Sequence, residues 1–199
     1  MKLKKLFLVS AIVLLVSACS QIAPPSISSP KSLGELITDL KNISKNYDII
    51  EVDINEKDEL TSDFGFVLLT LMKDGKNYSQ TLYYNYGIAH DDPKERKSSF
   101  DKGNPQSVNV EDIEKRQNEV EKYLENAKSQ INENLEGYSF KSIKSIKFYL
   151  NDNGNFETEL RINIIEDGNS ERRESGRTVI DYYTITFLAD SDGNVVYKE

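Results

Sequence analysis

Apolar and polar side chains alternate along much of the chain, and this alternation predicts β-strands. In the clearest segment, the side chains at every second position are apolar or β-branched, and charged or amide side chains stand between them. The apolar or β-branched set is Phe156, Thr158, Leu160, Ile162 and Ile164. Such a strand has one buried face and one solvated face. The same alternation, or a short apolar run, predicts strands at 50–54, 64–72, 78–88, 146–150, 178–188 and 195–197.

Short turn signals separate these strands. Asp74-Gly75, Asn153-Gly154 and Asp192-Gly193 favour two-residue hairpin turns. A charged turn at 167–177 precedes the strand at 178–188. Residues 89–109 form a polar loop that is long for a compact domain, and loops of that length are usually mobile or functional.

Two segments have the spacing of amphipathic helices. The first starts at Ser32, which forms a capping-box pattern with Glu35, and it ends near Asn46. Its apolar stripe is Leu33, Leu36, Ile37, Leu40 and Ile43. The second is capped by Asn109 and ends at Gly137. Its stripe is Ile113, Val120, Leu124, Ala127, Ile131 and Leu135.

The order of these elements predicts an α+β fold, with two helices packed on antiparallel, meander-type sheet. A helix precedes three strands, and a second helix precedes four more. That order fits either one curved sheet or two helix-plus-sheet halves. It is similar to cystatin-like and β-lactamase-inhibitor-like folds by analogy of pattern alone. We expect one globular domain at 32–199.

The start of the chain predicts a secretory signal. Basic side chains come first, at Lys2, Lys4 and Lys5, and an apolar run at 6–15 follows them. That run is shorter than the roughly twenty residues that a membrane-spanning helix needs. The segment therefore predicts a signal peptide at residues 1–18.

The end of this segment, Val16-Ser17-Ala18-Cys19, resembles the lipobox of bacterial lipoproteins. The resemblance implies that residues 1–18 are removed and that Cys19 carries a diacylglycerol and a further acyl chain such as palmitate. The lipid bilayer would then be a partner, and the protein would lie on the outer face of the bacterial cell membrane. In a double-membraned bacterium, Ser20 would permit the outer membrane instead. The alternative is a secreted protein with a free thiol.

Residues 19–31 are expected to form a lipidated, flexible tether, because prolines and serines dominate the segment. Removing the signal leaves 22 basic and 33 acidic side chains, a net charge of −11. Such a domain is repelled by phosphate backbones, so nucleic-acid binding is excluded. Cys19 is the only cysteine, which rules out a disulfide within one chain.

Five tyrosines in predicted strands are candidates for a partner surface: Tyr83, Tyr84, Tyr86, Tyr182 and Tyr183. Adjacent strand residues point to opposite faces, so each adjacent pair directs one tyrosine outward or into a second layer. Tyrosine is enriched at protein interfaces. The alternative is that these side chains fill the core.

No motif predicts catalysis, a metal or another cofactor. His90 stands beside Asp91 and Asp92, but the chain has no second histidine or cysteine pair to complete a metal site. The acidic residues at 190–194 favour a hairpin turn. We therefore expect a non-enzymatic binding module of the cell envelope, whose partner is another envelope or extracellular protein. A small-molecule or glycan-binding lipoprotein is the alternative, and a cell-wall hydrolase that uses unmarked carboxylates is a third.

Overall fold

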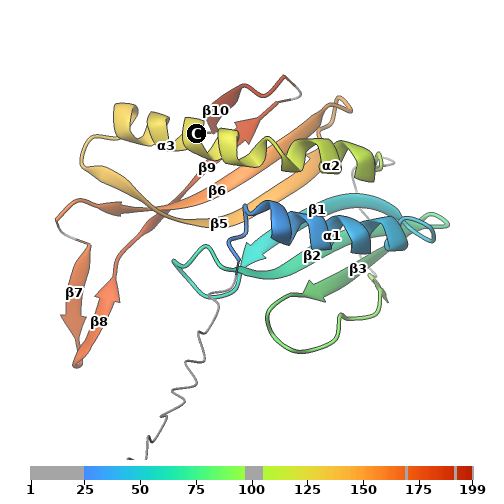
Figure 1. Ribbon diagram of the computed structural model, residues 1–199, viewed down its shortest axis with the longest axis horizontal. Coiled ribbons are helices and arrows are strands. Elements are labelled where there is room, and N and C mark those ends of the chain that lie inside the picture. Colours follow the sequence, from blue (N-terminus) through green and yellow to red (C-terminus); the bar gives the residue numbers. More distant parts are fainter. Residues whose placement is uncertain (1–24, 97–104, 169, 191, 199) are drawn as a thin grey trace, which may run out of the picture.

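The computed structural model describes residues 25–96, 105–168, 170–190 and 192–198. The predicted signal peptide and Cys19 lie outside these residues, as do positions 97–104 of the predicted loop. The fold is α+β, with three helices, an eight-stranded antiparallel sheet and a separate two-stranded ribbon (Figure 1). The helices are α1 (Pro30–Ile43), α2 (Val110–Gln117) and α3 (Val120–Asn134).

Ten strands make up the two sheets. The first half of the chain contributes β1 (Asp48–Glu56), β2 (Phe64–Lys73), β3 (Lys76–Tyr83) and β4 (Lys94–Glu95). The second half contributes β5 (Tyr138–Leu150), β6 (Phe156–Glu166), β7 (Glu171–Glu174), β8 (Arg177–Ile180), β9 (Tyr183–Ala189) and β10 (Val195–Lys198).

The large sheet has the strand order β10-β9-β6-β5-β1-β2-β3-β4. Strands β1 to β4 form one meander, and β5, β6, β9 and β10 form another. The two meanders join through their first strands, because β1 pairs with β5 in the antiparallel sense. Val52 lies opposite Phe148 and Asp53 opposite Lys147 in this pairing. The centre of the sheet thus combines segments that lie far apart in the sequence.

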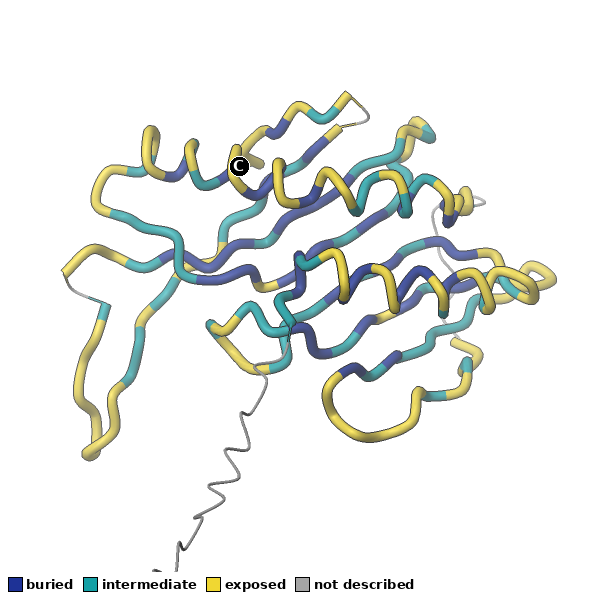
Figure 2. Tube along the Cα trace, viewed as in Figure 1, coloured by how far each residue is buried: buried dark blue, intermediate teal, exposed yellow. Residues whose placement is uncertain are grey.

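All three helices cover the same face of the large sheet, and α1 lies beside α2 (Figure 1). The buried positions of the strands and helices meet between these layers (Figure 2). Each predicted helix stripe faces this core. Fully buried members of the core include Leu36, Leu40, Ile54, Val67, Ile131, Ile146 and Phe148.

The predicted tether is wrong for its last residues, because 25–29 already belong to the folded domain. The N–H of Ile27 donates to the carbonyl of Ser62 at 2.8 Å, and that of Phe64 donates to the carbonyl of Pro25 at 2.9 Å. Ile27 is fully buried in the core. Burial of the apolar Ile27 side chain is favourable, and a solvated linker would leave that side chain in water.

The first helix begins earlier than the capping-box pattern predicts. Ser29 caps it, because the Ser29 hydroxyl accepts from the Ser32 N–H at 3.2 Å. Ser32 is fully buried, and its own hydroxyl donates to the carbonyl of Ser26 at 2.9 Å. Ser32 therefore lies inside the first turn of α1 and not at its cap.

The prediction of two helices is wrong in one respect, since the second is divided into α2 and α3. Its predicted cap is confirmed: the Asn109 side chain accepts from the Glu111 N–H at 2.9 Å. The division falls at 118–119, where the Glu119 N–H bonds to the carbonyl of Arg116, three residues earlier, at 2.9 Å. Such a bond tightens the chain and ends the α-helical ladder.

Two predicted strands are shorter than expected. The strand predicted at 78–88 ends at Tyr83, because Asn85 and Gly87 both adopt left-handed backbone conformations. The strand predicted at 178–188 is interrupted at 181–182 and supplies both β8 and β9. β7 and β8 form a hairpin that projects from the body of the domain (Figure 1).

Candidate functional site

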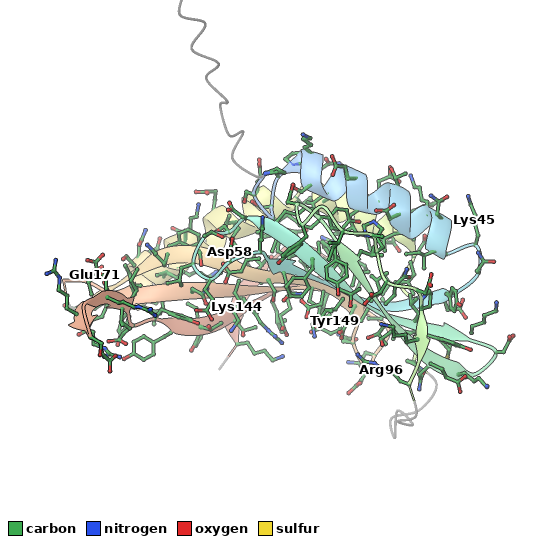
Figure 3. The ribbon with its side chains drawn as sticks, turned by 90° about the horizontal axis from the view of Figure 1, so that it is seen from below. Lys45, Asp58, Arg96, Lys144, Tyr149 and Glu171 are labelled. Carbon is green, nitrogen blue, oxygen red and sulfur yellow. The ribbon has the colours of Figure 1, made fainter. Side chains whose placement is uncertain are left out.

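One face of the large sheet carries no helix, and we call it the open face (Figure 3). Alternation along the strands places every second side chain there, opposite the buried set. The open face comprises Glu51, Asp53 and Asn55 of β1, Phe66 and Leu68 of β2, Tyr83 of β3, Ser145, Lys147 and Tyr149 of β5, Glu157, Glu159, Arg161 and Asn163 of β6, Thr184 and Thr186 of β9, and Val196 and Lys198 of β10.

Ion pairs connect the strands at the centre of the open face. The Lys147 ammonium lies 3.3 Å from a carboxylate oxygen of Glu51. The Glu159 carboxylate contacts Arg161 Nε at 2.9 Å and Lys198 Nζ at 3.5 Å. Only 8% of the Glu159 side chain is exposed, so this carboxylate depends on its two cations for compensation.

Asp53 is the least satisfied acid of the open face. Its Oδ1 is buried and has no hydrogen-bond partner in the described part of the chain. Burial raises the pKa of the Asp53 carboxyl above its ordinary value of 3.8, and nearby Lys147 and Arg161 only partly oppose this effect. Asp53 therefore stores unfavourable desolvation energy at neutral pH.

Asp53 and Glu159 do not converge on one point. Each lies opposite Lys147 in the sheet register, one on either side of it. Two strand spacings separate their backbones by roughly 10 Å. The arrangement is a row of alternating charges across β1, β5 and β6 with a lysine between the acids, and not a pair of carboxylates that face a common substrate atom.

A second carboxylate, Glu56, is held in a polar network under the β1–β2 loop. Asn163 Nδ2 donates to Glu56 at 3.2 Å and to the Ser142 hydroxyl at 3.0 Å, and the Thr184 hydroxyl donates to Asn163 Oδ1 at 2.9 Å. Burial raises the Glu56 pKa, and hydrogen bonds from the loop backbone oppose the rise. The network fixes the loop to the end of the sheet.

Aromatic and aliphatic side chains occupy the β2–β3 end of the open face. Leu68 is 41% exposed beside the partly buried Phe66. The Tyr83 and Tyr86 rings meet edge to face, with centroids 6.0 Å apart. Lys57 Nζ lies 5.3 Å from the Tyr86 centroid, within cation–π range. This end can offer a mixed apolar and aromatic contact surface.

The structure removes Tyr84 from the predicted tyrosine surface. Tyr84 is 8% exposed, and its ring stacks on Phe64 with centroids 4.4 Å apart. Its hydroxyl donates to Asp39 of α1 at 2.6 Å, and burial raises its pKa well above the ordinary range. Tyr84 is a core residue because β3 ends at Tyr83 and the next side chain turns under α1.

Tyr183 lies far from Tyr83 in the sheet, whereas Tyr182 approaches the β1–β2 loop. Four strands separate β9 from β3 in the sheet order. Tyr183 is 55% exposed and packs edge to face on Tyr138. The pKa of Tyr182 is raised by the burial of its hydroxyl and by the charge of Glu59 beside it. The five predicted tyrosines therefore form no single row, and their role in binding stays a prediction.

His90 lies beside the carboxylate of Asp39, which is far from it in the sequence. Its Nδ1 accepts from the Tyr83 N–H at 2.9 Å, and its Nε2 lies 3.5 Å from Asp39 of α1. The Asp91 N–H donates to the carbonyl of Thr81 at 2.9 Å. The first part of the predicted loop thus runs along β3 and covers its outer edge.

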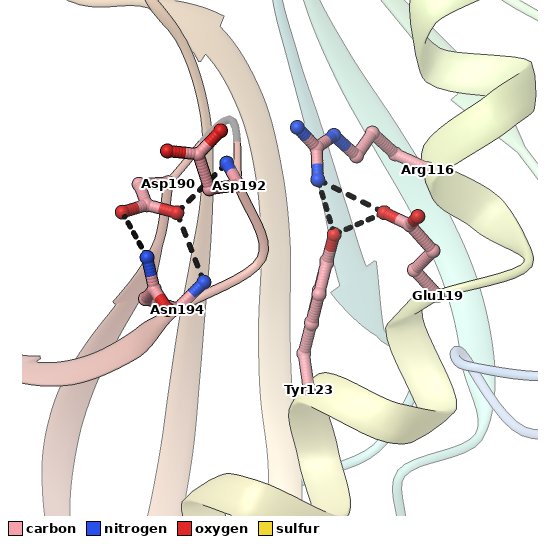
Figure 4. Close-up of polar contacts among 6 residues, drawn as sticks. All are labelled: Arg116, Glu119, Tyr123, Asp190, Asp192 and Asn194. Carbon is pink, nitrogen blue, oxygen red and sulfur yellow. Dashed lines mark hydrogen bonds and ion pairs between the residues drawn. The ribbon is translucent and has the colours of Figure 1, made fainter.

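A polar cluster marks the α2–α3 junction, where Arg116, Glu119 and Tyr123 contact one another (Figure 4). Arg116 donates to the Tyr123 hydroxyl at 2.5 Å and to Glu119 at 2.9 Å. Burial raises the Tyr123 pKa to about 12. The three side chains bond to one another across the junction, which is typical of a structural element.

The acidic segment near the C-terminus is the predicted hairpin turn (Figure 4). Asp190 accepts from the Asp192 and Asn194 backbone N–H groups at 2.9 Å each. Within the described ranges, no group of three or more histidine, cysteine or acidic side chains could hold a metal ion. No helix among the same residues is long and apolar enough to cross a membrane.

Sequence reasoning missed the charged row of Asp53, Lys147, Glu159 and Arg161. Their alternation with apolar residues predicted a solvated face, but the pairing of β1 with β5 that aligns them was not predictable from local pattern. No family model matches the chain, and no curated protein or solved structure matches it either.

Proposed function

We propose that this protein is a lipoprotein of the bacterial cell envelope, anchored through acylated Cys19, whose domain binds another envelope or extracellular protein. The observation that carries the binding role is the open face. Seven strands of the large sheet contribute polar, charged and aromatic side chains to it, and the described helices all lie on the opposite side. Tyrosine is enriched at protein interfaces, and the open face carries Tyr83 and Tyr149, with Tyr86 beside Tyr83.

The apolar end of the open face is the proposed contact centre. Leu68, Tyr83 and Tyr86 supply the large side chains that typically contribute most to binding. The neighbouring ion pair of Glu51 and Lys147 would belong to the polar rim that selects the partner by charge.

The test is crosslinking of the intact lipoprotein in its native envelope, followed by purification and mass spectrometry. We expect one dominant protein partner, lost when Tyr83 and Tyr86 are changed to Ser. Tyr183→Ser is the matched control, because it removes an exposed tyrosine that lies away from this contact centre. Retention of the partner in the double variant would refute the open face as the binding surface.

The anchor has a separate test. Cys19→Ala should release the protein from membranes and abolish acyl labelling while the domain stays folded. If the Cys19→Ala protein still sediments with the membranes and still carries the acyl label, the lipoprotein assignment is wrong. Ser20→Ala is the control, because it changes the adjacent residue and leaves the thiol in place.

A small-molecule or glycan ligand is the second candidate function. A largely apolar hollow of about 190 Å³ between α3 and the β9–β10 hairpin favours it, lined by Gln130, Asn134, Leu135, Phe187 and Tyr197. A compound that copurifies with the domain and is lost in Leu135→Asp would support this alternative over a protein partner.

We further propose that the two halves of the fold share an ancestral unit of one helix and a meander, comparable to cystatin-like or β-lactamase-inhibitor-like folds. Support comes from the repeated order, since α1 precedes β1–β3 and α2–α3 precede β5, β6 and β9. Homologous sequences in which the halves align with each other would test this origin.

A further inference from the structure

The two edges of the large sheet differ in how their backbone groups are satisfied. On the β3 side, the Asp91 N–H donates to the carbonyl of Thr81 and the Arg96 N–H to that of Asn77, at 2.9 and 2.8 Å. The Tyr83 N–H donates a hydrogen bond to His90 Nδ1. The outer edge of β3 is therefore closed, because the loop and the two-residue strand β4 occupy the positions that a further strand would need.

The β10 edge is open at Tyr197. The carbonyl of Asn194 accepts from the Asp190 N–H, so Asn194 faces β9. Because alternate residues of an edge strand face opposite ways, the N–H and C=O of Val195 and Tyr197 point away from the sheet. Gln130 of α3 satisfies the Val195 carbonyl at 2.7 Å. Nothing among the described residues bonds to the outward groups of Tyr197.

The two sides of the β10 edge differ in chemistry, one being apolar and the other polar and charged. On the helix side lies the apolar hollow between Leu135, Phe187 and Tyr197. On the other side lies a hollow of about 390 Å³ whose lining includes Arg161 and Lys198. Lys198 is the accessible cation here, because half of its side chain is exposed and its ammonium lies 3.5 Å from Glu159. Val196 and Tyr197 of β10 are themselves 55% and 47% exposed.

We propose that β10 is a docking edge that takes an extended segment of a partner protein in which apolar and acidic side chains alternate. The segment pairs with the outward backbone groups of Tyr197 as a ninth strand. Its apolar side chains lie on the helix side against Tyr197 and Leu135, and its acidic side chains lie opposite Lys198. Only an extended backbone matches both the spacing of the edge and its two chemically distinct sides.

This inference goes beyond the proposed function, because it places a second contact at the side of the sheet opposite the contact centre of the open face. The other occupant to consider is a second copy of the chain. Pairing of two four-residue edges buries far less than the roughly 1,200 Å² of a stable interface. The exposed ammonium of Lys198 instead matches an acidic side chain on the added strand.

The test uses the intact chain in detergent, labelled with ¹⁵N-tyrosine, and two capped octapeptides. One peptide alternates Val with Glu, and the other alternates Val with Lys. We expect the Val/Glu peptide to shift the Tyr197 amide signal and to bind about five- to tenfold more tightly than the Val/Lys peptide, because opposite charges on neighbouring strands attract and like charges repel.

The matched variant is Lys198→Glu, which should reverse the preference so that the Val/Lys peptide binds more tightly. An unshifted Tyr197 signal, or equal affinity for both peptides in both proteins, would overturn the proposal. A Tyr197 shift that grows with protein concentration in the absence of peptide would also overturn it, since a second copy would then occupy the edge.

Failure here and failure of the proposed function are distinguishable. The peptide experiment needs no native envelope, so a negative result leaves the crosslinked partner and the open face unaffected. Conversely, peptide binding with no crosslinked protein would leave β10 as a strand-binding edge and remove the open face as a contact surface.

Discussion

The Tyr84 hydroxyl lies 2.6 Å from Oδ2 of Asp39, and this bond joins the end of β3 to α1. His90 Nε2 lies 3.5 Å from the same carboxylate oxygen, so three elements meet at Asp39. A hydrogen bond to a charged group contributes more than one between neutral groups. The contact therefore fixes both the helix and the segment that covers the β3 edge.

Tyr84→Phe should lower the free energy of unfolding by about 1–2 kcal/mol, because it removes a partly buried hydrogen bond to a carboxylate. Urea denaturation at pH 7 measures the change. Tyr83→Phe is the control: its hydroxyl lies 3.5 Å from Asp91, at the limit of a hydrogen bond, so we expect a change below about 0.5 kcal/mol. Equal effects of the two variants would contradict the assigned role of Asp39.

Asp53→Asn should stabilise the domain at neutral pH by an amount of order 1 kcal/mol or less, since the carboxyl is partly open to water. Burial raises the folded-state pKa of Asp53, so the native protein holds its proton more tightly than the unfolded chain. Stability from this group is complete below the ordinary value of 3.8 and is lost as the pH rises through the folded pKa.

The gain from Asp53→Asn should therefore shrink as the pH falls towards 3.8. Urea unfolding of both proteins across this pH range measures it. Asp48→Asn, an exposed change on the same strand, should alter stability at pH 7 by less than about 0.5 kcal/mol. A destabilised Asp53→Asn protein at pH 7 would show that the attraction of Lys147 and Arg161 outweighs the burial of the carboxyl.

Leu124→Asp should unfold the domain, because it places an unpaired carboxylate in the core beneath α3. Circular dichroism and thermal denaturation give the readout. Asn126→Asp introduces the same group at an exposed position of the same helix, and it should leave the melting temperature within a few degrees. An unchanged melting temperature for Leu124→Asp would mean that α3 stands apart from the core.

Gly65→Ala and Gly34→Ala should act in opposite directions. A Cβ at Gly65 would lie 2.4 Å from the backbone Cα of Lys57, so one strand must move, and we expect a loss of about 2 kcal/mol or more. A Cβ at Gly34 of α1 meets nothing within 4 Å, and alanine there should gain about 0.5–1 kcal/mol from helix propensity. Paired urea titrations test both; equal stabilities would refute the close approach of β2 to Lys57.

Local sequence signals predicted local structure well. The Asn109 cap is confirmed by its bond to the Glu111 N–H. Asp74-Gly75 joins β2 to β3 with both residues at positive φ, as a type I′ turn requires. The cap and the turn depend on interactions among residues within a few positions of one another. The local sequence is therefore enough to predict them.

Features that depend on distant partners were not predictable. Ser29 and not Ser32 caps α1, because residues 25–29 are held against the β1–β2 loop from more than thirty positions away. Tyr84 is buried because Asp39 of α1 accepts its hydroxyl. The pairing of β1 with β5, which builds the charged row at the candidate site, spans about half of the chain.

The short hairpin of β7 and β8 was interpreted as a charged turn for a different reason. Each of its two strands is only four residues long, and every residue of β7 is charged. The segment therefore has no alternating apolar pattern. Ser175-Gly176 at positive φ supplies a type I′ turn, but serine is a weak signal for it.

The junction of the two meanders also sets an order of events during synthesis. β1 is complete at Glu56, but its partner β5 ends only at Leu150. At 5–20 residues per second the ribosome takes roughly 5–20 s to supply that partner. For this interval β1 can pair with β2 on one side, but its other edge, which later receives β5, stays unpaired. A chaperone that shields this strand until the second half emerges would decide how much of the protein escapes aggregation.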